Sequence, residues 1–173
     1  MSEDQTVTVA PLALDPLLAA VRERSTGIGS HVHGELHWRT VGANGLWLAG
    51  SVDDVDTEVM LLFALLHDAM RENDFTDPNH GRRAAAFAGE LHTEGLLGIA
   101  APQLDLLLHA CAGHADGTVS TDPTVGVCWD ADRLDLPRVG ITPRPELFST
   151  DVARRRTHHP AEAPAWPELF GRL

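Results

Sequence analysis

Apolar residues recur at helical spacing along most of the chain, and alternating runs of β-branched residues are almost absent. This pattern predicts an all-α fold of six or seven helices. The run VMLLFALL is apolar on every face, which predicts a helix in the centre of the fold. From Pro137 onward, proline-rich segments predict an extended tail on the surface. The expected helices cover residues 12–24, 35–48, 54–70, 82–95, 102–111 and 122–136.

Length and composition fit one globular domain. The chain has 173 residues, of which 43% are hydrophobic and 22% charged, and a chain of this size can bury a core. We divide it into an N-terminal segment with one helix (1–29), a helical core (30–141) and a proline-rich tail packed on the core (142–173). The acidic N-terminus does not resemble a signal peptide, and no apolar run approaches the roughly 18 residues of a membrane span. We therefore expect a cytoplasmic protein.

The charge balance excludes several classes of function. Lys and Arg total 13 against 25 Asp and Glu, so the formal net charge is −12, and all the cations are arginine. Without lysine, Schiff-base catalysis and a Walker-type phosphate loop are excluded. Few cations are present to neutralise phosphates, so we expect no nucleic-acid polymer as a partner.

Histidine and aspartate gather near the ends of the predicted helices. His67 and Asp68 end the most apolar helix, where an ionised carboxylate needs a metal ion or an arginine as its partner. Mixed imidazole and carboxylate groups suit Mn, Fe, Zn, Co or Ni. The other residues of these types near helix ends are His31, His33, His37, His80, His109, His114, Asp130, Asp132 and Asp135.

The order of these residues resembles that of the HD superfamily of metal-dependent phosphohydrolases. His37 lies in HWRTVGANGLWLA, which is similar to the first helix of the family, and FALLHDAMR is similar to its ALLHDIGR/K pattern. CWDADRLDLPRVGI resembles its closing helix. The resemblance extends from about Ser30 to Ile141 and implies an HD-type helical bundle, with residues 30–141 as its metal-binding core.

The resemblance also implies metal ligands. His37, His67, Asp68 and Asp132 match the ligands of the family, and Asp68 is able to bridge two ions. Members with two metals use additional histidines, for which His80 and His114 are the candidates. We expect one or two divalent ions per chain, drawn from Mn, Fe, Zn, Co, Ni or Mg. Two choices stay open at this stage, namely His109 or His114 and Asp130 or Asp132.

Without lysine, arginine must supply the positive charge that a phosphorylated substrate needs. Arg71 follows the doublet where the family often has a basic residue, and Glu72 is a candidate to move a proton or order a water. The candidate catalytic residues are thus Asp68, Arg71 and Glu72. The candidate substrate-binding residues are His33, Arg71, Arg82, Arg83 and Arg133.

These features together predict a phosphomonoesterase or phosphodiesterase that uses a metal-activated water on a small phosphorylated metabolite, for example a nucleotide. One alternative is a di-iron oxygenase on the same scaffold, and another is a non-catalytic metal- or ligand-binding protein. We expect no membrane partner, and the formation of a homo-oligomer stays open.

Overall fold

The computed structural model describes residues 12–155 and 163–173, and in these ranges it contains helices and no strands. The prediction of an all-α fold is confirmed. Two short 3-10 helices and two five-residue helices follow the six longer ones. The elements are α1 (Leu14–Arg24), α2 (Glu35–Ala49), α3 (Thr57–Leu66), α4 (His80–Thr93), α5 (Ala101–Gly113), α6 (Pro123–Arg133), η1 (Leu136–Val139), η2 (Pro145–Leu147), α7 (Asp151–Arg155) and α8 (Trp166–Phe170).

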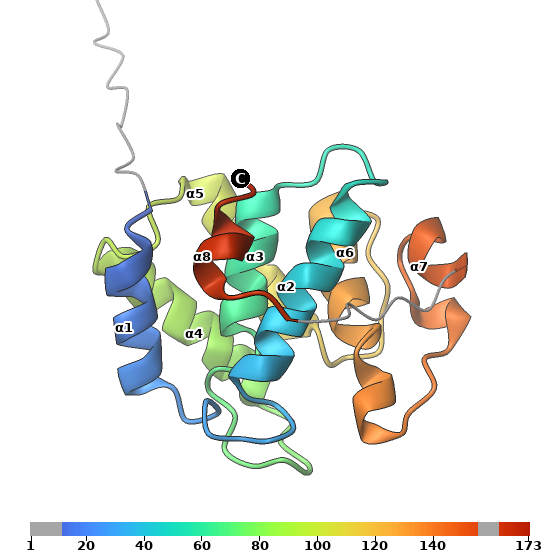
Figure 1. Ribbon diagram of the computed structural model, residues 1–173, viewed down its shortest axis with the longest axis horizontal. Coiled ribbons are helices and arrows are strands. Elements are labelled where there is room, and N and C mark those ends of the chain that lie inside the picture. The colour runs from blue at the N-terminus through green and yellow to red at the C-terminus, as the bar shows by residue number, and fades with distance from the viewer. Residues whose placement is uncertain (1–11, 156–162) are drawn as a thin grey trace, which may run out of the picture.

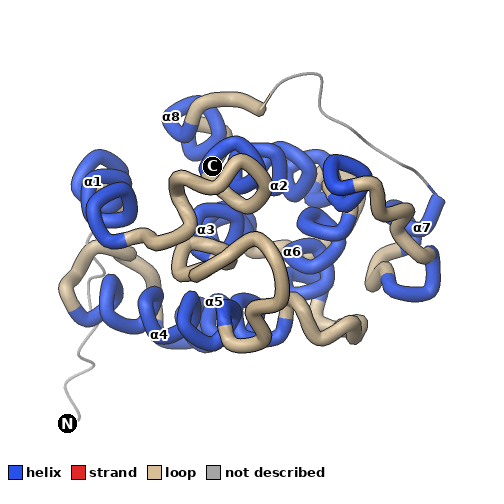
Figure 2. Tube along the Cα trace, turned by 90° about the horizontal axis from the view of Figure 1, so that it is seen from below, coloured by secondary structure: helices blue, strands red, loops and turns tan. Residues whose placement is uncertain are grey.

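Helix α3 lies in the middle of the molecule, surrounded by the other long helices (Figures 1 and 2). Every residue from Val59 to Leu66 is buried, as the continuous apolar run predicts. The helix packs against α2, α5 and α6 along its length. Its C-terminal end is therefore enclosed by neighbouring helices, and polar residues placed there are withdrawn from solvent.

Close helix contacts hold α2 in this arrangement. Gly45 of α2 lies so near the side chain of Met60 in α3 that a Cβ at this position would force the methionine side chain to move. The neighbouring Asn44 is buried, and its Nδ2 donates a hydrogen bond of 3.1 Å to the carbonyl of Ala131 in α6. Together these contacts fix α2 between α3 and α6.

Capping residues set the starts of α3 and α6. The carboxylate of Asp56 accepts a hydrogen bond of 3.0 Å from the backbone N–H of Val59, and Asp122 does the same for Val125. Asp122 and Pro123 are thus the N-cap and first-turn pair that the sequence predicts. Both helices are shorter than the predicted ranges 54–70 and 122–136, and turns follow where those ranges continue.

The C-terminal tail is more helical than the sequence pattern indicates. Instead of staying extended, its described residues fold into η2, α7 and α8. Trp166 and Leu169 of α8 are buried against α2 and α3, because the segment WPELF carries enough apolar surface to pack as a short helix. Residues 156–162 of the predicted tail lie outside the described ranges. Within those ranges, no helix combines the length and apolar character that crossing a membrane requires.

Candidate metal centre

The His67–Asp68 doublet follows directly after α3. The ring of His67 stacks on Phe63 one turn earlier, with 4.9 Å between the ring centroids. Its Nδ1 lies 3.2 Å from the carbonyl oxygens of Phe63 and Ala64, so its Nε2 is left facing the neighbouring helices. Burial lowers the pKa of His67 to about 3. The imidazole is therefore neutral near pH 7, as a metal ligand must be.

Helices α2 and α6 bring His37 and Asp132 to the same place. The Nε2 of His37 lies 3.2 Å from the Nε2 of His67 and 3.3 Å from Oδ1 of Asp132. Burial acts to lower the pKa of His37, but hydrogen bonds to Asp132 and Asp135 outweigh it, and the pKa is raised. Burial acts to raise the pKa of Asp132, but His37 and the nearby histidines hold it well below its usual range. This pair therefore favours a positive charge between its atoms.

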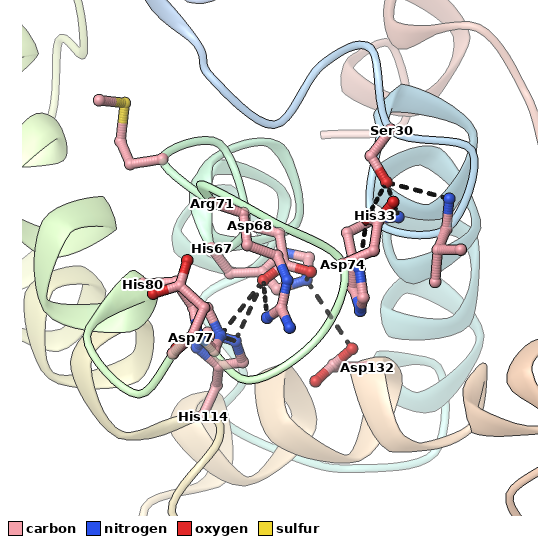
Figure 3. A network of polar contacts seen from close by, with 12 residues as sticks. Ser30, His33, His67, Asp68, Arg71, Asp74, Asp77, His80, His114 and Asp132 are labelled. Carbon is pink, nitrogen blue, oxygen red and sulfur yellow. Dashed lines mark hydrogen bonds and ion pairs between the residues drawn. The ribbon is translucent and has the colours of Figure 1, made fainter.

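His80 at the start of α4 and His114 at the end of α5 form a second histidine pair (Figure 3). The Nδ1 of His80 lies 2.5 Å from the carbonyl of Asp77, and the Nδ1 of His114 lies 2.8 Å from the carbonyl of Cys111. When each Nδ1 donates to its carbonyl, the two Nε2 atoms face each other, 2.9 Å apart. Two lone pairs at this distance repel unless a proton or a cation lies between them.

This approach depends on Gly81. A Cβ at this position would lie 2.6 Å from the carbonyl oxygen of Cys111, closer than side chains approach a backbone. The absence of a side chain at Gly81 thus lets the start of α4 lie against the end of α5. As a result, two histidines 34 residues apart in sequence come into contact.

Asp68 lies between the two histidine pairs, of which Figure 3 shows His67, His80 and His114. Its Oδ2 is 3.7 Å from the Nε2 atoms of His37 and His67. Its Oδ1 is 3.4 Å from the Nε2 of His80 and 3.5 Å from that of His114. Burial acts to raise the pKa of Asp68, but the surrounding histidines outweigh it and the pKa is lowered. The buried Oδ1 lies 3.6 Å from Nη1 of Arg71 but accepts no hydrogen bond among the described residues, so it has capacity for a further cation.

The cluster fits divalent metal ions. In three groups of residues, one potential ligand atom from each member lies within 4.8 Å of the others. Together the three groups contain four imidazoles and two carboxylates, a donor set that suits borderline transition metals. They are His37, His67 and Asp68; His67, His114 and Asp132; and Asp68, His80 and His114.

Further carboxylates support the cluster from outside. The Nδ1 of His37 lies 2.7 Å from Oδ2 of Asp135, which orients the ring. Near His80, the carboxylate of Asp77 accepts a hydrogen bond of 2.6 Å from Arg83 and one of 2.9 Å from the backbone N–H of Glu72. These contacts fix the turn that carries His80.

A cavity of about 320 Å³ opens beside the cluster. Of the predicted substrate-binding residues, His33, Arg71 and Arg133 line it, together with Asp68, Asp132, His80 and His114. Arg71 donates to the carbonyls of Asn73 and Phe75 and so also braces the loop after α3.

The structure places three other predicted site residues outside this cavity. The side chain of Glu72 is 65% exposed and lies 3.7 Å from Arg83, so it does not face the cluster. Arg83 pairs with Asp77, and Arg82 is exposed on α4. Both arginines are on a helix whose first residue, His80, points inward, and the helical turn directs the following side chains elsewhere.

The structure separates the two pairs of alternatives that the sequence leaves open. His114 is in the cluster, whereas His109 lies against Trp129, with 5.8 Å between the ring centroids. Asp132 is in the cluster, whereas Asp130 is fully buried and binds the backbone N–H groups of Ser149 and Thr150.

Three carboxylates around the site are not among the site residues that the sequence predicts. Asp77 and Asp135 support the histidines, and Asp74 lies 3.0 Å from Nδ1 of His33 at the cavity edge. Asp135 had a usable signal, because it follows Asp132 by three residues at the end of a helix. Asp74 and Asp77 are in a polar loop with no periodic pattern, so no comparable signal exists for them.

No protein-family model matches this sequence, and no curated protein matches it. A structural comparison finds similarity to the crystal structure of a predicted HD superfamily hydrolase from an uncultured Thermotogales bacterium. The match covers 83% of this chain and 82% of that one, with a TM-score of 0.63 and 27% sequence identity.

Proposed function

The chain has the fold and the buried His/Asp cluster of an HD-superfamily protein, and on this premise we propose that it is a metal-dependent phosphohydrolase acting on a small phosphorylated metabolite. The observation that carries this proposal is the position of Asp68. Its two oxygens face two separate histidine pairs, and one of them is buried without a hydrogen-bond partner among the described residues. A carboxylate in this position is suited to hold cations on both sides.

The side chains around the cavity have two different roles, metal binding and phosphate binding. A divalent ion bound by the cluster would make hydroxide available near neutral pH and polarise a phosphoryl oxygen. Arg71 and Arg133 line the same cavity and place positive charge beside the position of a phosphoryl group. In the reaction, the oxygen of water forms a bond to phosphorus and the ester P–O bond breaks. The leaving alcohol takes a proton, and phosphate is released.

The test is a hydrolysis assay on metal-loaded protein with a panel of phosphate monoesters and diesters. We expect turnover by the wild type, and a loss of about a thousandfold or more in Asp68→Asn, because the variant removes the charge shared by both histidine pairs. Asp105→Asn is the matched control, since Asp105 is exposed on α5. Absence of turnover on the whole panel, with tight metal binding, would instead support a non-catalytic metal-binding protein.

One observation also favours a second function, a di-iron oxygenase. His80 and His114 complete a set of four histidines and two aspartates, and this donor set also suits iron. Metal analysis and oxygen uptake on iron-loaded protein separate the two functions. Two irons per chain with substrate-dependent oxygen consumption would favour the oxygenase, whereas turnover with a redox-inactive metal such as Zn would favour the hydrolase.

A further inference from the structure

The wall of the cavity that faces the cluster is largely apolar. It is formed by residues that follow α6, in and after the two 3-10 turns. The wall residues are Leu136, Pro143, Leu147 and Phe148. None of these side chains can form a hydrogen bond. The same segment also contributes Arg138 and Arg144 to the lining. The cavity therefore has one side with imidazoles and carboxylates and another where apolar side chains lie among arginines.

Two buried charged residues of α6 hold this wall in place. Asp130 accepts hydrogen bonds of 2.7 and 2.8 Å from the backbone N–H groups of Ser149 and Thr150, and another of 2.8 Å from the Thr150 hydroxyl. Three residues later, Arg133 donates a hydrogen bond of 2.5 Å to the carbonyl of Leu147. Because α6 also carries Asp132, one helix fixes the apolar wall relative to the metal cluster.

One nitrogen of the Arg133 guanidinium forms no hydrogen bond with the described residues. This nitrogen is Nη2, and the residue is only 6% exposed. The guanidinium lies over the ring of Trp129, 5.7 Å from its centroid, and lines the cavity. A buried cationic N–H without a partner is costly, and the positive charge of this guanidinium favours an anion in the adjoining cavity.

Of the other arginines around the cavity, Arg144 is exposed, whereas Arg71 and Arg138 are already engaged by backbone carbonyls. Arg138 uses its Nε for the carbonyl of Val32 and its Nη1 for the carbonyl of Asp135. Arg71 is held by two loop carbonyls. Arg133 is therefore the buried arginine of the cavity whose free donor is not committed to the described protein atoms.

From these observations we infer the substrate class. The cavity binds phosphate monoesters whose organic part is compact and apolar or planar. The phosphoryl group lies between the cluster and Arg133, and the organic part lies on the wall of Leu136, Leu147 and Phe148. A cavity of about 320 Å³ is of a size that suits a small molecule. This inference rests on the proposed phosphohydrolase function and specifies which class of substrate the site prefers.

Two phosphonates test the inference without hydrolysis. In benzylphosphonate and 3,4-dihydroxybutylphosphonate, a methylene replaces the ester oxygen, and the organic part is planar and apolar in the first and polar in the second. Calorimetry on full-length, Mn²⁺-loaded protein should show about tenfold tighter binding of benzylphosphonate, because only its ring gains from apolar burial. Equal affinities, or tighter binding of the polar compound, would overturn the inference.

Variants of the wall locate the preference. In Leu147→Asn the ratio of the two affinities should fall to about threefold or less, since the ring then meets an amide. Leu136→Asn is a second variant of the same wall in case the first does not fold. Ile141→Asn is the matched control, because Ile141 belongs to the same segment but is 52% exposed and does not line the cavity. An unchanged ratio in either folded wall variant would contradict the inference.

Arg133→Met should weaken both phosphonates by about tenfold, because the variant removes the positive charge beside the phosphoryl group. Unchanged binding in this variant, once folded, would refute the role of Arg133. The outcomes also separate the inference from the proposed function. Equal hydrolysis of aromatic and polar monoesters would contradict the inferred preference but support the hydrolase function. A clear preference for benzylphosphonate without any hydrolysis would support the preference and contradict the hydrolase function.

Discussion

The Nδ1 of His37 lies 2.7 Å from Oδ2 of Asp135, a contact that joins residues 98 positions apart in sequence. Asp135 in turn lies 3.5 Å from the Nε of Arg138. When Nδ1–H donates to Asp135, the neutral imidazole keeps the lone pair on Nε2, which faces Asp68 and Asp132. The carboxylate thereby selects the tautomer of His37 that can bind a metal.

Asp135→Ala should weaken the binding of divalent metal by about 10- to 100-fold, because the ring of His37 loses the partner that orients it. Competition with a chromophoric chelator measures this affinity. Asp105→Ala, which changes an exposed carboxylate on α5, should behave like the wild type. Wild-type affinity in a folded Asp135→Ala variant would show that the contact does not support metal binding.

Metal affinity should rise with pH. Burial acts to lower the pKa values of His37 and His114, but nearby carboxylates outweigh it and both pKa values are raised. These imidazoles therefore hold protons up to a higher pH than a free histidine, and a cation must displace them. For each proton released, the affinity should rise by up to about tenfold per pH unit as the pH increases through about 6.5, the ordinary histidine pKa. Calorimetry in buffers of different ionisation enthalpy counts the protons, and a pH-independent affinity would contradict this prediction.

The two histidine pairs predict two separable metal positions. His114→Ala should reduce the metal content from two ions per chain to one, because it leaves His80 and Oδ1 of Asp68 as an incomplete site. His109→Ala is the matched control, since His109 is on the same helix but lies against Trp129. Elemental analysis of the purified variants gives the content. The prediction fails if His114→Ala and the wild type bind the same number of ions.

The helices could be predicted from periodicity because most of them bury one face, but their ends depend on tertiary contacts. The predicted helix 54–70 ends at Leu66, and the chain then turns. The carbonyl of Ala69 accepts hydrogen bonds from the Ser25 hydroxyl (2.5 Å) and the backbone N–H of Gly27 (3.0 Å), two partners from a distant segment. Sequence periodicity carries no information on such partners, so the end of the helix could not be located from it.

The candidate site divides in the same way. His37, His67, Asp68 and Asp132 could be placed because their order and their helix positions form a motif. The apolar wall that contains Leu147 could not be predicted, because its few apolar residues lie among prolines and show no helical or strand periodicity. Their position follows from buried hydrogen bonds to Asp130 and Arg133, whose partners are backbone groups and leave no mark in the sequence.

Asp130→Ala should lower the free energy of unfolding by about 1–3 kcal/mol, because it leaves buried donors of Ser149 and Thr150 without an acceptor. Denaturant unfolding measures the change. Asp151→Ala, at an exposed carboxylate in the adjacent helix α7, should change the stability by less than about 0.5 kcal/mol. Equal effects in the two variants would show that Asp130 does not hold the segment after η2.

The ion pair of Asp77 with Arg83 should make stability depend on acidic pH. Burial acts to raise the pKa of Asp77, but the hydrogen bond from Arg83 outweighs it, and the pKa is lowered. A carboxyl with a lower pKa in the folded state adds stability above its unfolded pKa and loses it as the pH falls through the folded value. Asp77→Asn should therefore be less stable than the wild type near pH 7, by about 1–3 kcal/mol.

The difference between the two proteins should shrink below about pH 4, where the wild-type carboxyl takes up its proton. Urea unfolding at several pH values measures both curves, and Glu146→Gln, at an exposed glutamate, should run parallel to the wild type. Because the Asp77 carboxylate fixes the turn whose backbone carbonyl contacts His80, the variant should lose metal affinity as well. Parallel stability curves for Asp77→Asn and the wild type would mean that the pair with Arg83 contributes nothing to the fold.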